Sequence, residues 1–268
     1  MGPHRAKVLP ARFFLLVVCL SLPFYLAGAL TSFQLLPGLP VSSLILVCPV
    51  TAALILVQRE SQTPGIKGLL KRSFDYKRTG ARIWYLPTIL LMPAIMVLSY
   101  VFQQSTGGSL PAPQISVLGA LALCCALFVA ALGEELGFSG YVIDPMQDRW
   151  GALGASILLG SFWALWHIVP LVEASRSPSW IAGWCVGTVA ARTIIVWLYN
   201  NTGRSVFAAA LFHATINITW QLFPINGSFY DPGVTGLITA AVAVIIVVVW
   251  GPRTLVRGSR YLAARADM

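Results

Sequence analysis

Eight stretches of the chain are long and apolar enough to cross a lipid bilayer, and they constrain the fold more than any other feature. A membrane-spanning helix needs about 20 mainly apolar residues. The candidates cover roughly residues 12–31, 41–58, 83–103, 115–142, 152–172, 180–199, 205–223 and 233–250. Because lipid cannot hydrogen-bond backbone groups, each stretch is expected to be helical. The sequence therefore predicts an all-α polytopic bundle of about eight transmembrane helices.

The connections between these stretches leave no room for a soluble domain. Only 10% of the 268 residues are charged and 57% are hydrophobic, whereas soluble domains carry about 25% charged residues. We therefore expect residues 1–268 to form a single transmembrane domain. The first stretch also has the features of a secretory signal peptide. A retained anchor is favoured because its apolar run is long.

The net charge of +9 is unevenly distributed, and this predicts the orientation. Loops 32–40 and 104–114 carry no charge, whereas basic residues gather in loop 59–82 and at both termini, at Arg5, Lys7, Arg12, Arg253, Arg257, Arg260 and Arg265. The positive-inside rule then places both termini, loop 59–82 and loop 143–151 in the cytoplasm. We expect a multi-pass protein of a plasma membrane, most simply a bacterial one.

The basic residues are expected to contact anionic lipid, and the middle of loop 59–82 to lie on the membrane surface. Nucleic acid is not an expected partner, because no folded basic domain or base-stacking platform accompanies the charges.

Few polar side chains interrupt the spans, and such residues mark functional sites because burying them in lipid is costly. They come from four of the predicted helices: Glu134, Glu135, His167, Arg192, His213 and Asn217.

The spacing of these residues separates two roles for the neighbouring glutamates. Glu134 and Glu135 differ by about 100° around a helix, so they must face different partners. We expect one to face a cavity and the other to be tied to the scaffold. His213 and Asn217 are four residues apart and share a helix face, as do Trp163 and His167.

The depths of these side chains agree, with one exception. Glu134, Arg192 and His213 each lie about 15 Å from the predicted cytoplasmic ends of their helices. His167 is about fifteen residues past Ala152 and is predicted to be too deep, unless its helix starts below the surface or tilts strongly.

A carboxylate, two imidazoles and a carboxamide suit hydrolysis of an amide bond. Burial favours the neutral form of a carboxylic acid, which suits a general base near neutral pH. Histidine and asparagine can donate hydrogen bonds to a developing oxyanion. Alternatively, Glu134, His167 and His213 could bind zinc, although no HExxH pair is present. The sequence leaves open whether the cofactor is zinc or none.

Three segments in this order, "GEELGFSGY", "FWALWH" and "HATIN", resemble the CPBP or Abi family of membrane proteins. Its motifs are EExxxR, FxxxH and HxxxN or HxxxD, within an eight-helix bundle. The family includes CAAX prenyl endopeptidases and bacteriocin-processing proteases. The resemblance covers about residues 115–223.

The resemblance implies a role for each matching residue. Glu134 corresponds to the glutamate that activates water, and Glu135 to a supporting glutamate. His167 corresponds to the histidine of the second motif, while His213 and Asn217 correspond to the third motif, which forms the oxyanion site. Members have been regarded as metalloproteases, although the prenyl-processing branch favours a metal-free glutamate mechanism.

Two positions depart from the motifs. Ser139 stands where an arginine is expected, and Trp163 where a phenylalanine is expected. Losing the arginine removes a cation that should hold a carboxylate. Arg192 is the one basic residue deep in a predicted span, so we predict that it pairs with Glu135.

The resulting hypothesis is an intramembrane endopeptidase that acts on a peptide or protein substrate in or at the membrane. Ser139 supports an alternative, a weakly active or inactive membrane scaffold of the same fold. Buried glutamate and histidine would also suit a proton-coupled transporter, but no internal repeat is seen. Prenylation of the substrate and the oligomeric state stay open; a bacterial source would favour a peptide pheromone, a bacteriocin precursor or a membrane protein.

Overall fold

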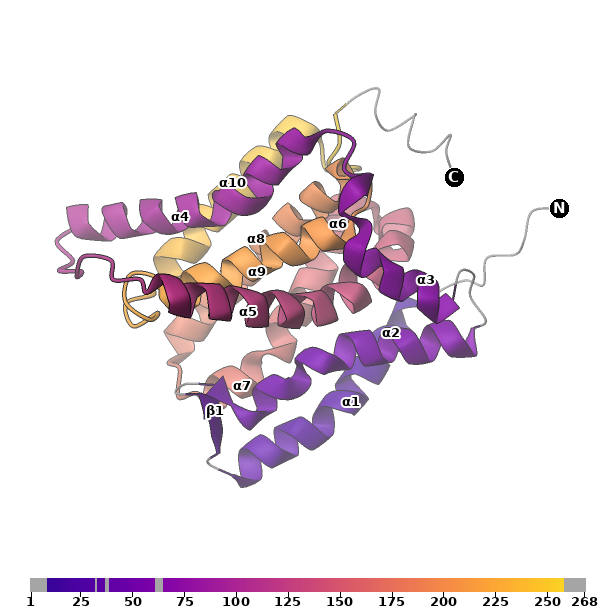
Figure 1. Ribbon diagram of the computed structural model, residues 1–268, viewed down its shortest axis with the longest axis horizontal. Helices are drawn as coiled ribbons and strands as arrows, with labels where there is room; N and C mark the ends of the chain where they lie inside the picture. Colours follow the sequence, from indigo (N-terminus) through magenta and orange to yellow (C-terminus); the bar gives the residue numbers. More distant parts are fainter. Residues whose placement is uncertain (1–8, 32, 37–38, 61–64, 258–268) are drawn as a thin grey trace.

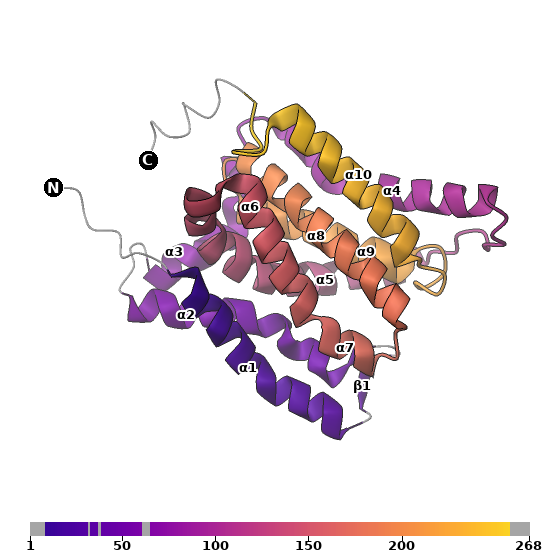
Figure 2. The ribbon, with the colours of Figure 1, turned by 180° about the vertical axis from the view of Figure 1, so that it is seen from behind.

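Helices account for nearly all of the chain that the structure describes, which is residues 9–31, 33–36, 39–60 and 65–257 of a computed structural model. Figures 1 and 2 show these helices from opposite sides. Four of the basic residues used to predict the orientation lie outside the described residues: Arg5, Lys7, Arg260 and Arg265.

The elements follow one another with short connections. The first part of the chain forms α1 (Pro10–Leu30), the antiparallel strands β1 (Gln34–Leu36) and β2 (Leu39–Pro40), the 3₁₀-helix η1 (Val41–Val47), α2 (Cys48–Arg59), α3 (Gly65–Lys71) and the 3₁₀-helix η2 (Arg72–Arg78). The rest forms η3 (Arg82–Trp84), α4 (Tyr85–Ser105), α5 (Val117–Gly137), the π-helix η4 (Phe138–Val142), α6 (Ile143–Trp166), α7 (Ile168–Glu173), α8 (Pro178–Asn201), α9 (Val206–Leu222) and α10 (Pro232–Trp250).

The predicted all-α polytopic fold is confirmed. Among the described residues, six helical stretches are long and apolar enough to span a membrane, and α9 is a shorter apolar helix. One of the six, Val117–Glu173, is 57 residues long and contains both α5 and α6. Because a span needs about 20 residues, this stretch holds more than one of the eight predicted helices.

The prediction of a loop at residues 143–151 is wrong. Helical structure continues from η4 into α6, which starts at Ile143. The direction changes at Gly151, whose φ of 69° few other residues adopt. The N–H groups of Ala152 and Leu153 then donate to the carbonyls of Arg253 and Pro252. Charged residues between positions 143 and 151 interrupt the apolar pattern, as is typical of a loop, but in the structure they belong to α6.

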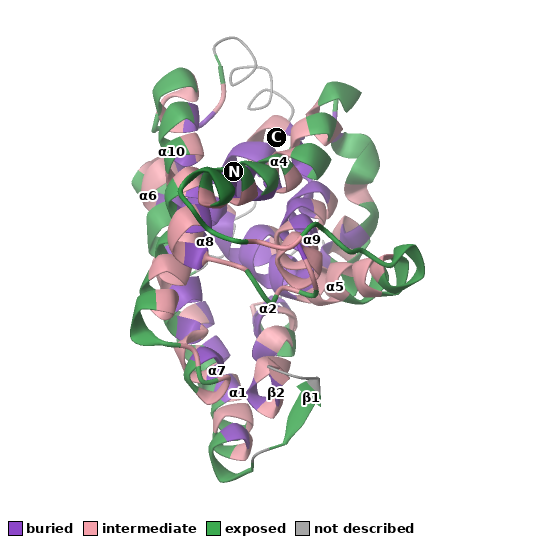
Figure 3. Cartoon of the chain, turned by 90° about the vertical axis from the view of Figure 1, so that its left-hand side faces the viewer, coloured by how far each residue is buried: buried purple, intermediate pink, exposed green. Residues whose placement is uncertain are grey.

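The helices that carry the predicted site form the middle of the bundle. Figure 1 shows α5, α8 and α9 between α4 and α10 on one side and α1 and α2 on the other. α5 packs against α9, and α6 packs against α8. In Figure 3 the buried residues concentrate in these inner helices, whereas the peripheral helices expose apolar side chains, such as Leu30 of α1 at 82% and Val248 of α10 at 78%. In a membrane such side chains contact lipid.

Glycines bring the site helices close together. A Cβ atom at Gly137 would lie 2.5 Å from the carbonyl oxygen of Pro49, so α5 contacts the start of α2 just after the two glutamates. A Cβ at Gly160 would lie 2.9 Å from Val189 Cα and 3.1 Å from Arg192 Cβ. Small residues at these crossings let helix backbones approach closely. Gly160 therefore brings Arg192 of α8 next to Trp163, one turn further along α6.

Candidate active site

Glu134 lies in the last turn of α5 and is buried, with 5% of its surface exposed. Its Oε2 accepts a hydrogen bond of 2.9 Å from the indole Nε1 of Trp163. Its Oε1 accepts none from the described residues, yet it is not among the fully enclosed polar atoms that lack a partner. This oxygen therefore keeps some accessible surface and can receive a proton.

Glu135 is surrounded quite differently, because both of its oxygens are occupied. Nη1 of Arg192 lies 2.9 Å from Oε1 and 2.9 Å from Oε2. Nδ1 of His213 donates to Oε1 at 3.0 Å, and the hydroxyl of Ser139 donates to Oε2. The side chains of Glu135 and Arg192 are both 0% exposed. The predicted pairing of Arg192 with Glu135 is present in the structure.

Arg192 also lies against two aromatic rings. Its guanidinium carbon lies 4.4 Å from the ring centre of Trp163 and 5.1 Å from that of Phe138. Cation–π contacts of this kind offset part of the cost of burying the charge. Its Nε and Nη2 atoms are enclosed and have no hydrogen-bond partner among the described residues. The charge is therefore stabilised by one carboxylate and two rings.

Ser139 lies in the π-helical turn η4 that follows the two glutamates. Single π-helical turns within α-helices occur often at functional sites. Here the turn keeps Ser139 within hydrogen-bonding reach of Glu135, one turn before it. The structure thus provides a cation for Glu135 from α8, in place of the arginine expected at position 139.

The two histidines use their Nδ1 atoms in the scaffold. The carboxylate of Glu135 can only accept, so His213 donates from Nδ1. His167 Nδ1 lies 2.9 Å from the carbonyl oxygen of Trp163, which also can only accept. Neither Nε2 atom has a partner among the described residues, and neither is fully enclosed. An imidazole that donates from Nδ1 presents an Nε2 lone pair whenever the ring is neutral.

Trp163 connects the parts of the site. Its ring centre lies 4.7 Å from that of His213 and 6.0 Å from that of His167. With its hydrogen bond to Glu134 and its contact with Arg192, it touches four of the predicted site residues. The predicted mismatch in depth does not separate His167 from the others, because Trp163 lies one turn before it in α6.

Asn217 is the one predicted site residue that the structure leaves outside this network. It is half-buried on α9, one turn after His213, and forms no hydrogen bond with the other described residues. Its shared face with His213 keeps it next to the site.

The zinc set that the sequence left open is not assembled as a cluster. Within residues 9–31, 33–36, 39–60 and 65–257, no three His, Cys, Asp or Glu side chains are grouped closely enough to hold a metal ion. Glu134 instead accepts a hydrogen bond from Trp163, and His213 binds Glu135.

Two polar residues near the site were not predicted from the sequence to contribute to it. Arg72 and Asp75 of η2 bind the turn after Glu135 and the start of α9. The one weak signal for them is an acidic residue, Asp75, within a basic loop.

Comparisons with known proteins agree with this geometry. The family model of Rce1-like type II CAAX prenyl endopeptidases matches residues 116–219, which include Glu134, His167, His213 and Asn217. A CAAX prenyl protease 2 of Methanococcus maripaludis is 28% identical over 263 residues, covering 88% of this chain and 93% of that protein. These matches confirm that the chain resembles the CPBP family of intramembrane proteases, as its three motifs indicate.

Proposed function

We propose that the protein is an intramembrane endopeptidase in which Glu134 activates water. The contrast between the two glutamates carries this proposal. Both oxygens of Glu135 are occupied by Arg192, His213 and Ser139, whereas Glu134 has one oxygen free and accessible. The carboxylate with a free oxygen is the one that can take a proton.

The reaction needs only water and the peptide. Glu134 takes a proton from water while the water oxygen bonds to the carbonyl carbon of the scissile peptide. The C=O electron pair moves to oxygen and forms an oxyanion. When the C–N bond breaks, this pair returns, and the proton held by Glu134 passes to the leaving nitrogen. The products are a carboxyl group and an amine.

His213 and Asn217 are proposed to bind the oxyanion, each by its own chemistry. The amide nitrogen of Asn217 is a donor in every state. His213 donates from Nε2 only when it is protonated, because its Nδ1 proton already binds Glu135. In its neutral form the same Nε2 accepts a hydrogen bond from water. His167 has the same arrangement and is proposed to orient the attacking water.

We propose the route without metal over the zinc alternative. The support is the spacing of the donors: among the described residues, Glu134, His167 and His213 are not grouped closely enough to hold one metal ion.

The proposed substrate is a membrane-bound protein or peptide with a prenylated C-terminus. The matched family model and the relative from Methanococcus maripaludis are both named for CAAX prenyl processing. In a CAAX sequence the lipid is attached to the cysteine. Such a substrate reaches the site from the bilayer. We propose the orientation with both termini in the cytoplasm, in a bacterial plasma membrane.

The test is cleavage of a quenched-fluorescence peptide that carries a farnesylated CAAX cysteine, by protein purified in lipid nanodiscs. Glu134→Gln keeps the size of the side chain and the oxygen that accepts from Trp163, but it cannot take the proton. We expect cleavage to fall at least 100-fold with an unchanged thermal unfolding temperature. Cleavage by Glu134→Gln at the wild-type rate would contradict the proposal, and no cleavage by the wild type would favour the scaffold.

A further inference from the structure

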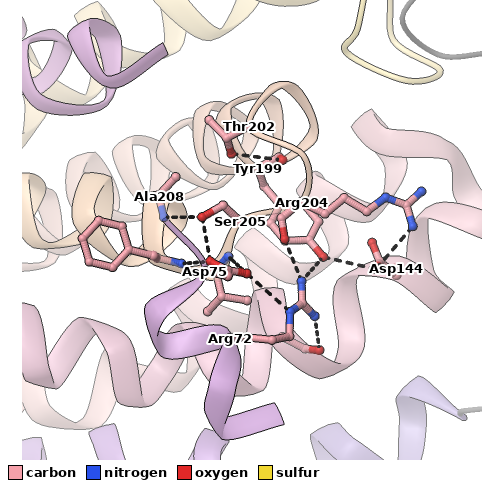
Figure 4. A network of polar contacts seen from close by, with 11 residues as sticks. Arg72, Asp75, Asp144, Tyr199, Thr202, Arg204, Ser205 and Ala208 are labelled. Carbon is pink, nitrogen blue, oxygen red and sulfur yellow. Dashed lines mark hydrogen bonds and ion pairs between the residues drawn. The ribbon is translucent and has the colours of Figure 1, made fainter. Parts of the chain in front are cut away.

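The segment between α2 and α4 carries two side chains that reach into the bundle. η2 packs against α9, and Figure 4 shows the polar contacts at the start of that helix from close by. From η2, Arg72 and Asp75 point toward this helix start, while their neighbours Lys71 and Phe74 are exposed. Arg72 and Asp75 therefore make contacts within the protein, in contrast to the charged side chains that are expected to face the membrane surface.

Arg72 binds the turn that follows the glutamates. Its Nη1 donates to the carbonyl oxygen of Gly140 at 2.7 Å, and Gly140 lies in the π-helix η4. Its Nη2 donates to the Tyr199 hydroxyl and to the Arg204 carbonyl oxygen, both at 2.8 Å. One guanidinium thus joins η4 to the end of α8 and to the connection that leads into α9.

Asp75 binds the first turn of α9. Its Oδ1 accepts from the Ser205 hydroxyl at 2.7 Å and from the Phe207 N–H at 3.0 Å, and its Oδ2 accepts from the Val206 N–H at 3.2 Å. A carboxylate at a helix N-terminus satisfies free N–H groups and interacts favourably with the helix dipole. Arg72 and Asp75 also form an ion pair of 3.8 Å between Nε and Oδ2.

Arg72 binds Gly140 and Asp75 binds Val206, and both of these backbone positions are close in sequence to a site residue. Gly140 is one π-helical turn past Glu135, and Val206 is about two α-helical turns before His213. Gly140 and Val206 also lie close together in space, because a Cβ atom at Gly140 would lie 3.7 Å from Val206 Cγ2. The same Cβ would lie 3.0 Å from Leu69 Cδ1 of α3. Any shift between η4 and α9 would change the contact of Glu135 with His213.

We propose that Arg72 and Asp75 are positioning residues of the active site. They fix η4 relative to α9 and so hold the hydrogen bond between Glu135 and His213. The effect on catalysis rests on the proposed endopeptidase function. The effect on the position of the His213 ring does not depend on that function, because the hydrogen bond between His213 and Glu135 exists whether or not the protein cleaves peptides.

The experiment combines two measurements on Arg72→Lys and Arg72→Gln. The first is the ring ¹⁵N spectrum of histidine-labelled protein in nanodiscs, where the chain has three histidines to resolve. The second is kcat and KM for the farnesylated peptide. Lysine keeps the charge but lacks the planar fork that reaches three acceptors. We expect both variants to shift the His213 signals and to lower kcat about tenfold or more, with KM changed less than twofold.

Lys71→Gln is the matched control, because it removes a neighbouring positive charge from an exposed side chain. We expect it to leave both measurements unchanged. If Arg72→Gln fails to fold, Arg72→Lys decides alone. The proposal is overturned if His213 signals stay in place in the folded Arg72 variants, or if they move without a fall in kcat. A wild type that cleaves no peptide would refute the function while the spectra still test the positioning.

Discussion

Nη1 of Arg192 lies 2.9 Å from each carboxylate oxygen of Glu135, in a pair with no exposed surface. The two residues are 57 positions apart and come from α8 and α5. The pair fixes one glutamate as part of the scaffold, which leaves Glu134 as the carboxylate with a free oxygen. It also supplies the cation that the sequence lacks at position 139.

Arg192→Gln and Glu135→Gln should each destabilise the fold strongly, and the double variant should lose less than the sum. Removing one partner leaves a buried unpaired charge, which costs about 3–5 kcal/mol. Removing both leaves two neutral amides. A double-mutant cycle measured by chemical unfolding in mild detergent gives the coupling. Strict additivity of the two losses would show that the pair does not interact.

Trp163→Phe should lower kcat and leave the fold largely intact. Phenylalanine is the residue expected at this motif position, and its ring can still cover Arg192. The lost indole N–H leaves Glu134 Oε2 without a partner, and a hydrogen bond to a charged group is worth about 1.5–3 kcal/mol. Peptide cleavage and thermal unfolding check this. Trp180→Phe is the control, since Trp180 contacts Trp220 and Tyr230 instead. A wild-type kcat for Trp163→Phe would show that the indole N–H has no catalytic role.

Ser139→Arg should be harmful in the wild type and helpful when Arg192 is absent. Ser139 is 1% exposed, so a larger side chain there strains a filled space, at a typical cost of about 1–3 kcal/mol. It also adds a second cation beside a carboxylate that is already paired. In the Arg192→Gln background the new arginine can take over the pairing.

The measurement for this prediction is the unfolding free energy of the four combinations, with cleavage as a second readout. Ser139→Ala serves as the control, because it removes the hydroxyl bond to Glu135 without adding charge. If Ser139→Arg lowers stability equally in both backgrounds, the cation cannot be supplied from η4.

Chelators should leave peptide cleavage unchanged if Glu134 acts without a metal. Among the described residues, no three His, Cys, Asp or Glu side chains around Glu134 are grouped closely enough to bind a metal ion. Treatment with EDTA and with 1,10-phenanthroline, followed by elemental analysis of the purified protein, tests this directly. Loss of cleavage that zinc restores would establish the zinc route instead.

The fold class and most residues of the candidate site could be predicted from local patterns in the sequence. A bilayer admits few charged or polar side chains, so Glu134, Glu135, His167, Arg192, His213 and Asn217 are conspicuous in apolar stretches. Helical spacing also separated the two glutamates, because adjacent residues point about 100° apart. Both signals are local, and a local pattern can be read from the chain alone.

The partners of these groups depend on how distant segments pack, which local patterns do not predict. No local sequence pattern predicts that the Trp163 indole donates a hydrogen bond to Glu134. Nor does any local pattern predict that η2 binds Gly140 and the start of α9. Arg72 is 68 residues from Gly140, and Asp75 is 132 residues from Phe207. In a basic, partly apolar loop such residues resemble surface charges. Their role follows from packing between distant segments, which leaves no periodic trace in the sequence.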